Sequence, residues 1–136
     1  MTEQEIIYTM ALTRVPRVNT AAQHRLMEEL GSASAVFDHR HHIRDFYPEA
    51  SDKLSATLQE MEVQVARAEE ELEFTRKHHI KCLCYHDTDY PSRLRECDDA
   101  PLLLYYKGNA DLNRTYVVNM VGTRHCTEYG KDICRR

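Results

Sequence analysis

Apolar residues recur every three or four positions near the start of the chain, which is the spacing of one face of an α-helix. The residues on this face are Ile6, Ile7, Met10 and Ala11. Thr2, followed three residues later by Glu5, forms a capping box, the sequence signature of a helix N-terminus. Because Pro16 cannot continue a helix, we expect a short amphipathic helix that ends just before it.

A second capping box, Thr20 with Gln23, predicts the start of another helix. Gly31 stands where a left-handed C-terminal cap is expected, and Ser32 can then cap a third helix through Phe37. The apolar side of the second helix consists of Ala22, Leu26, Met27 and Leu30. Residues 38–47 have a weaker pattern, in which the residues able to reach a core are Ile43, Phe46 and Tyr47. The first 50 residues are therefore expected to form a bundle of short helices.

Residues 52–79 carry a heptad-like pattern that predicts one long helix. Its apolar positions, spaced four and three residues apart, are Leu54, Leu58, Met61, Val65, Ala68 and Leu72. So short a pattern favours a packing helix that connects two domains, with a dimeric coiled coil as the alternative. His78 and His79 suit the C-terminal end of this helix, where a cation complements the helix dipole.

From residue 80 the pattern changes to short β-rich apolar runs bounded by turn residues, and we expect strands at 80–85, 102–106 and 116–121. Residues 92–96 suggest a short helix between the first two strands, and residues 107–109 a turn after the second. The third strand runs directly into Gly122, and Thr127 can cap a helix that continues to the end.

The composition is that of an ordered protein: 136 residues, 42% hydrophobic and 29% charged, with a net charge of −4. No apolar run approaches the length of a membrane span, and the first residues do not resemble a signal peptide, so a cytoplasmic location is expected. The five cysteines lack CxxC spacing, which predicts buried free thiols and neither disulfides nor a zinc site.

Charge is distributed unevenly along the chain. Residues 1–50 carry 5 basic and 7 acidic side chains, residues 51–80 carry 4 and 7, and residues 81–136 carry 9 and 8. The last part alone is net positive, so a polyanionic partner is expected to bind there.

The most specific candidate site follows the third predicted strand and consists of Gly122, Thr123, Arg124 and Thr127. Free backbone N–H groups at a helix N-terminus bind anions, and an arginine adds a bidentate phosphate donor. The plainer alternative is a strand-to-helix turn with a surface arginine. Neither a dinucleotide fingerprint nor a Walker A loop is present, so no cofactor is expected.

Other candidate groups carry weaker signals. The histidines His24, His39, His41 and His42 lack carboxylate or thiol partners at ligand spacing, so no metal is expected. The loop carboxylates Asp87, Asp89, Asp98 and Asp99 suit turns better than acid–base catalysis. The aromatic rings that would stack on bases if exposed are Tyr105, Tyr106, Tyr116 and Tyr129.

The chain resembles the DNA-processing protein A family (DprA, also called Smf). Residues 10–16, 26–32 and 35–37 are similar to the family's helical sterile-alpha-motif-like domain, although Arg17-Val18-Asn19 stands where related helical domains have Gly-x-Gly. Residues 90–95, 99–109, 121–124 and 129–130 are similar to the opening of its Rossmann-like domain.

The resemblance implies an α/β protein with a sterile-alpha-motif-like domain at 1–50, a connecting helix at 51–80 and an incomplete Rossmann-like DNA-binding domain at 81–136. It also implies single-stranded DNA binding and RecA loading during natural transformation, without enzymatic activity. The family's Gly-Ser/Thr-Arg motif, whose arginine meets the DNA backbone, corresponds to Gly122, Thr123 and Arg124. Candidates to widen the basic surface are Lys107, Arg114, Lys131, Arg135 and Arg136.

Later motifs of the family are absent, so we expect a truncated part of a longer protein. The RecA-contacting and self-association surfaces would then lie in the missing part, the full-length parent being a homo-oligomer. Two other functions stay open: a protein-interaction adaptor built on the helical domain, and a lysine-decarboxylase-like nucleotide hydrolase, which needs a downstream Pro-Gly-Gly-x-Gly-Thr motif.

Overall fold

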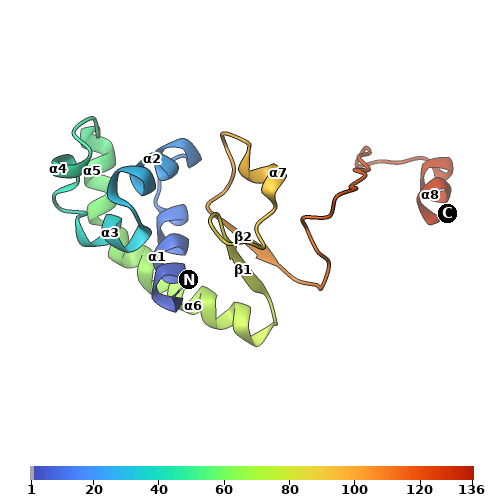
Figure 1. Ribbon diagram of the computed structural model, residues 1–136, viewed down its shortest axis with the longest axis horizontal. Coiled ribbons are helices and arrows are strands. Elements are labelled where there is room, and N and C mark those ends of the chain that lie inside the picture. Colours follow the sequence, from blue (N-terminus) through green and yellow to red (C-terminus); the bar gives the residue numbers. More distant parts are fainter. Residues whose placement is uncertain (1) are drawn as a thin grey trace.

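A computed structural model describes residues 2–136, with a helical part followed by a short two-stranded part (Figure 1). The helical part contains α1 (Glu3–Arg14), α2 (Thr20–Leu30), α3 (Ala33–Asp38), α4 (Ile43–Phe46), α5 (Asp52–Gln59) and α6 (Met61–Lys77). The second part contains β1 (Lys81–Cys84), α7 (Ser92–Arg95), β2 (Leu103–Tyr106) and α8 (Glu128–Arg135).

Most predicted helix ends are confirmed. Thr2 and Ser32 accept hydrogen bonds from the first turns of α1 and α3, and Gly31 adopts φ 93° at the end of α2. The capping box at Thr2 is only half formed, because the Glu5 carboxylate reaches α3 and accepts hydrogen bonds from the backbone N–H groups of Ala33 (2.7 Å) and Ser34 (3.4 Å). One side chain of α1 thus helps to cap a second helix.

The capping box predicted at Thr20 and Gln23 is wrong. Asn19 is the N-cap of α2, and its side chain accepts a hydrogen bond from the Ala22 N–H at 2.8 Å. Gln23 is buried and donates its side-chain amide to the Val18 carbonyl at 3.1 Å. Asparagine is as good a cap as threonine, and tertiary burial of Gln23 decides between the two alignments.

The single long helix predicted over residues 52–79 is also wrong, since α5 ends at Gln59 and α6 begins at Met61. The heptad positions nevertheless point inward: Leu58, Met61 and Ala68 are fully buried, and Leu54 and Val65 pack against the core. This part of the chain packs within the molecule, and the pattern reflects that burial. His78 forms the C-terminal cap of α6, as predicted.

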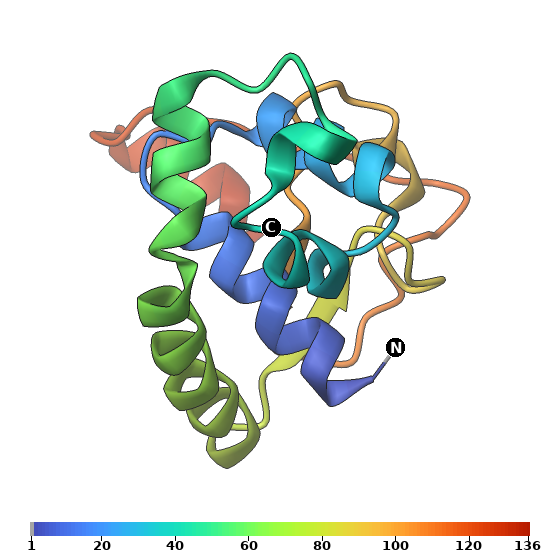
Figure 2. The ribbon, with the colours of Figure 1, turned by 90° about the vertical axis from the view of Figure 1, so that its left-hand side faces the viewer.

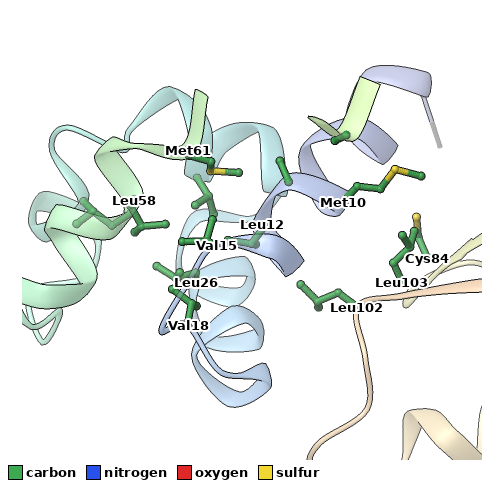
Figure 3. Close-up of a cluster of buried hydrophobic side chains, with 14 of the residues drawn as sticks. Met10, Leu12, Val15, Val18, Leu26, Leu58, Met61, Cys84, Leu102 and Leu103 are labelled. Atoms are coloured by element: carbon green, nitrogen blue, oxygen red, sulfur yellow. The ribbon is translucent and has the colours of Figure 1, made fainter. Parts of the chain in front are cut away.

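Helix α1 lies at the centre of the helical part, with α6 along one side and α3 along another (Figure 2). Its residues Thr9 to Leu12 are successive and all buried, so it is covered on more than the one face that its spacing predicted. Figure 3 shows Leu12 among side chains of the helices, and Met10 on the side of Leu102, Leu103 and Cys84 from the second part. One hydrophobic core therefore joins the helices to the strands.

Strands β1 and β2 form an antiparallel pair in which Lys81 lies opposite Tyr106 and Cys84 opposite Leu103. The third predicted strand is wrong: residues 116–121 are extended but unpaired. A strand needs a neighbour for its backbone hydrogen bonds, and the two-stranded sheet does not reach this segment. Within residues 2–136 no parallel pair is present, so the Rossmann-like assignment stays a prediction.

The chain beyond Thr115 leaves the rest of the molecule and ends in α8 (Figure 1). We call residues 2–115 the body and residues 116–136 the arm. Side chains in the arm that are apolar are largely solvent-exposed, with Tyr116 at 92%, Val118 at 93% and Val121 at 92%. The hydrogen bonds and ion pairs of the arm's side chains all lie within the arm.

The five cysteines are free, as predicted, but only part of the prediction of buried thiols is confirmed. Cys84 is buried and Cys82 half-buried, whereas Cys97, Cys126 and Cys134 are exposed. Burial raises the pKa of the Cys84 thiol to about 12. None of the helices described in residues 2–136 is both long and apolar enough to cross a membrane.

Candidate nucleic-acid interface

The four residues of the candidate site lie together in the arm, where the extended segment turns into α8. Thr127 is the N-cap of this helix, with an extended backbone at φ −75° and ψ 163°. Its hydroxyl accepts a hydrogen bond from the Gly130 N–H at 3.1 Å, and its carbonyl accepts one from Lys131 at 3.1 Å. The predicted cap is confirmed, and it fixes where the helix begins.

The first turn of α8 keeps backbone donors available. No residue in the described part of the chain accepts a hydrogen bond from the backbone N–H of Glu128 or Tyr129. Such N–H groups carry the positive end of the helix dipole and favour an anion. The Glu128 carboxylate occupies the same turn, but Lys131 pairs with it at 3.3 Å and offsets its charge.

Arg124 is exposed, and its guanidinium makes no hydrogen bond or ion pair with any residue from 2 to 136. Neighbouring Thr123 differs, since its hydroxyl donates to the His125 carbonyl at 3.0 Å. The Thr123 oxygen keeps its lone pairs, but its proton is already used within the loop. Arg124 is therefore the group in this turn with an uncompensated charge directed to solvent.

The surroundings of Gly122 are open. A Cβ atom added there would meet nothing within 4 Å, and the backbone does not adopt the left-handed conformation that favours glycine. Nothing in residues 2–136 therefore requires a glycine at this position. An open glycine beside free amides allows a ligand to approach the backbone closely.

A hollow of about 710 Å³ lies between the end of the extended segment and α8. Its lining is mostly apolar and includes Met120, Val121, Ile133 and Cys134, with the cations Lys131 and Arg135 also part of it. The Met120 and Cys134 sulfur atoms are 3.4 Å apart. The hollow adjoins Gly122, so the backbone at this turn faces open space.

The accessory basic residues are spread over the molecule. Lys107 directly follows β2 and Arg114 lies at the base of the arm, both of them exposed. The other candidates belong to α8 or its end, where Lys131 pairs with Glu128 and Arg136 pairs with Asp132 at 3.4 Å. Lys131, Arg135 and Arg136 therefore lie in the arm with Arg124, whereas Lys107 and Arg114 lie on the body.

The other candidate residues, which are histidines, loop carboxylates and tyrosines, either make structural contacts or are exposed. No cluster of three potential metal ligands occurs among residues 2–136, and the Nε2 atom of His24 is hydrogen bonded to the Ala100 carbonyl at 2.5 Å. Asp87 accepts a hydrogen bond from the Cys84 N–H at 2.8 Å, which fits its predicted turn. Tyr116 and Tyr129 are exposed at 92% and 75%, so both rings are accessible for stacking.

Sequence reasoning assigned no role to Arg93 or Asn113, which hold the base of the arm. Arg93 donates to the carbonyls of Arg114 (2.9 Å) and Thr115 (3.0 Å), and Asn113 accepts a hydrogen bond from the Ser92 N–H at 2.7 Å. These contacts join residues more than twenty positions apart. The Asp111-x-Asn113 spacing signals a turn, but nothing local in the sequence identifies its partners.

Comparison with known proteins bears on the second half of the chain. Residues 81–136 match the sequence model of a family described as DNA recombination-mediator protein A. A stretch of 44 residues is 50% identical to a protein named DNA processing protein DprA from Streptococcus pneumoniae (strain ATCC BAA-255 / R6). That stretch covers 32% of this chain and 16% of the relative, so the match spans about a sixth of the relative's length. No solved structure matches the chain.

Proposed function

We propose that this protein binds single-stranded DNA and helps to load RecA recombinase onto it during natural transformation, since residues 81–136 match the model of the DNA recombination-mediator protein A family. The observation that carries the proposal is the exposed Arg124 guanidinium, which has no partner among the described residues and shortly precedes in the sequence the free amides that begin α8. We place this activity in the cytoplasm and assign it no catalytic step and no cofactor.

The proposed contact is with the sugar–phosphate backbone. Arg124 supplies a charged, bidentate donor to one phosphate, and the N–H groups of Glu128 and Tyr129 supply neutral donors at the positive end of the helix dipole. Gly122 lets the DNA backbone approach the protein backbone closely, while Thr123 and Thr127 offer hydroxyl oxygens for hydrogen bonds to the DNA. Because these groups read no base edges, the binding is expected to be largely independent of sequence and sensitive to salt.

We further propose that the arm and the two strands are the opening of a Rossmann-like domain at 81–136, preceded by a sterile-alpha-motif-like domain at 1–50 and a connecting helix at 51–80. Contact with RecA and homo-oligomer formation are proposed for the full-length family protein. Lys107, Arg114, Lys131, Arg135 and Arg136 are proposed as accessory cations that extend the electrostatic field toward the DNA.

The adaptor function remains the alternative, but its test must use the whole chain. The hydrophobic core of the helices continues into β1 and β2 through Cys84, Leu102 and Leu103. A fragment of residues 1–80 would therefore expose part of that core, and its binding to other proteins would be uninformative.

The proposal is tested by fluorescence anisotropy of a labelled oligo-dT with the wild-type chain and with Arg124→Ala. Loss of one charged phosphate contact should weaken binding about tenfold and should reduce the slope of log K against log[salt] by about 0.7. Arg67→Ala removes the same charge from α6, where Arg67 pairs with Glu70, and serves as the matched control. Equal losses in the two variants would show a nonspecific charge effect and refute the assigned site.

A further inference from the structure

The last residues of the body, from which the arm begins, are fastened to residues 88–93 by five hydrogen bonds that involve two side chains. The Asn113 side chain accepts from the Ser92 N–H at 2.7 Å and donates to the carbonyls of Tyr90 (3.1 Å) and Thr88 (3.3 Å). The Arg93 guanidinium donates to the carbonyls of Arg114 and Thr115. We call this set of contacts the clasp.

The body side of the clasp is well supported. Tyr90 is fully buried, and its hydroxyl donates to the Pro101 carbonyl at 2.7 Å. Helix α7 has no side-chain cap of its own, because Pro91 stands at its N-cap position. Asn113 supplies the missing acceptor to the first N–H of that helix, so its position is tied to a rigid part of the fold.

Arg93 has a role of its own in the clasp. Among residues 2–136 no carboxylate pairs with it, and its hydrogen bonds go to the last two carbonyls of the body. Beyond Thr115 the polar contacts of the arm's side chains all lie within the arm, so the clasp marks the last point at which the body holds the chain.

We propose that Asn113 and Arg93 are positioning residues for the arm: they fix the point from which Arg124 is presented to DNA. This inference rests on the proposed function. The preceding fixed point is Ala110, whose N–H and carbonyl both bond to the Tyr106 hydroxyl. Without the clasp, the free tether to Arg124 would lengthen from the nine residues 116–124 to the fourteen residues 111–124.

The consequence for binding follows from tether length. DNA that already contacts the body, at the exposed Lys107 for example, meets Arg124 at an effective concentration that falls roughly as the −3/2 power of the tether length. The lengthening above lowers that concentration about twofold. Loss of the clasp should therefore weaken DNA binding without removing any phosphate contact.

The experiment compares Asn113→Ala with Asn119→Ala in the full chain, using the same oligo-dT titration. Asn119 is an exposed asparagine of the arm whose side chain makes no hydrogen bond to the rest of residues 2–136. Asn113→Ala removes three of the five clasp hydrogen bonds, so we expect it to bind more weakly by up to about twofold with an unchanged salt slope, and Asn119→Ala to match the wild type. In parallel, hydrogen exchange of the Ser92 amide should accelerate in Asn113→Ala alone.

Two other results would overturn the inference. Affinity equal to wild type in Asn113→Ala, with a faster Ser92 amide, would leave the clasp a merely structural contact. A smaller salt slope in Asn113→Ala would mean that a phosphate contact was lost, so that positioning is not the cause. In either case the titration of Arg124→Ala shows which proposal has failed. If Arg124→Ala also leaves the DNA affinity unchanged, the proposed function itself fails. If Arg124→Ala weakens binding, the proposed function stands and only the positioning role of Asn113 and Arg93 is lost.

Discussion

The body and the arm use similar side chains to opposite effect. In the body, apolar residues from six helices and two strands converge on one core, and Met10, Leu12 and Leu26 are fully buried. In the arm, the apolar side chains of Val118 and Val121 and the aromatic ring of Tyr116 remain in solvent. Side-chain type alone therefore does not create a core, because an apolar strand is buried only where a neighbouring element receives it.

The polar groups of the two regions differ in the same way. Several polar side chains of the body find partners across long sequence separations, as when Glu5 caps α3 and Asn113 caps α7. In the arm, Arg124 and the first amides of α8 are left without partners among the described residues. Polar contacts between distant segments are thus concentrated in the body, whereas Arg124 and these amides remain available to a ligand.

The largest expected effect comes from deleting buried methyl groups in the body. Leu12→Ala should lower the free energy of unfolding by about 2–5 kcal/mol, because Leu12 is fully buried and its neighbours cannot fill the space. Val118→Ala in the arm should change it by less than about 0.5 kcal/mol. Urea titrations followed by circular dichroism measure both, and a similar loss in the two variants would contradict the division into body and arm.

A smaller loss of stability is expected at Glu5, the side chain of α1 that caps the N-terminus of α3. Glu5→Ala removes the acceptor for the Ala33 N–H and should cost about 1–2 kcal/mol. Glu5→Gln keeps an acceptor oxygen and should recover part of that loss. Glu28→Ala removes an exposed carboxylate from α2 and is the control, which should stay near wild type in the same urea titration.

Alkaline pH should weaken the body by a further mechanism. Burial raises the pKa of Cys84 from 9.0, and that of Tyr105 from 10.0, to about 12 in each case. Because the folded state keeps these protons longer than the unfolded state, stability is complete below about pH 9 and falls as the pH rises toward 12. Unfolding free energies measured across that range should decline less steeply in Cys84→Ala, and an unchanged slope would exclude a contribution from this thiol.

The smallest effect on stability is expected at Gly122. Since a Cβ there meets nothing within 4 Å and the backbone is not left-handed, Gly122→Ala should unfold with wild-type stability. The added methyl group should still hinder a phosphate that approaches the backbone, and DNA affinity should fall several-fold. Loss of stability with unchanged DNA affinity would reverse the interpretation of this glycine.

The sequence predicted best what neighbouring residues decide. Thr2, Ser32 and Thr127 are caps within their own segments, and their positions are confirmed. Failures occur where distant residues compete: burial of Gln23 moved a cap to Asn19, and the helix over 52–79 is interrupted at Glu60. The strand over 116–121 had the right composition, but pairing depends on elements elsewhere in the chain.

The candidate site shows the same limit. Its cap and its cluster of residues were predictable because they are contiguous, from Gly122 to Thr127. The pairing of the charged side chains around it could not be predicted, since only the structure shows that Lys131 is paired and that Arg124 is without a partner in residues 2–136. The clasp at Asn113 joins loops far apart in sequence, so no local pattern indicates it.

We propose that a phosphate backbone binds at the turn where the extended arm meets α8. It is tested most directly by amide chemical shifts of the ¹⁵N-labelled chain during titration with unlabelled oligo-dT at low salt. We expect the largest shifts at residues 122–129, and we expect them to disappear as salt is raised. Shifts confined to the body, or an arm that is unaffected at saturating DNA, would contradict it.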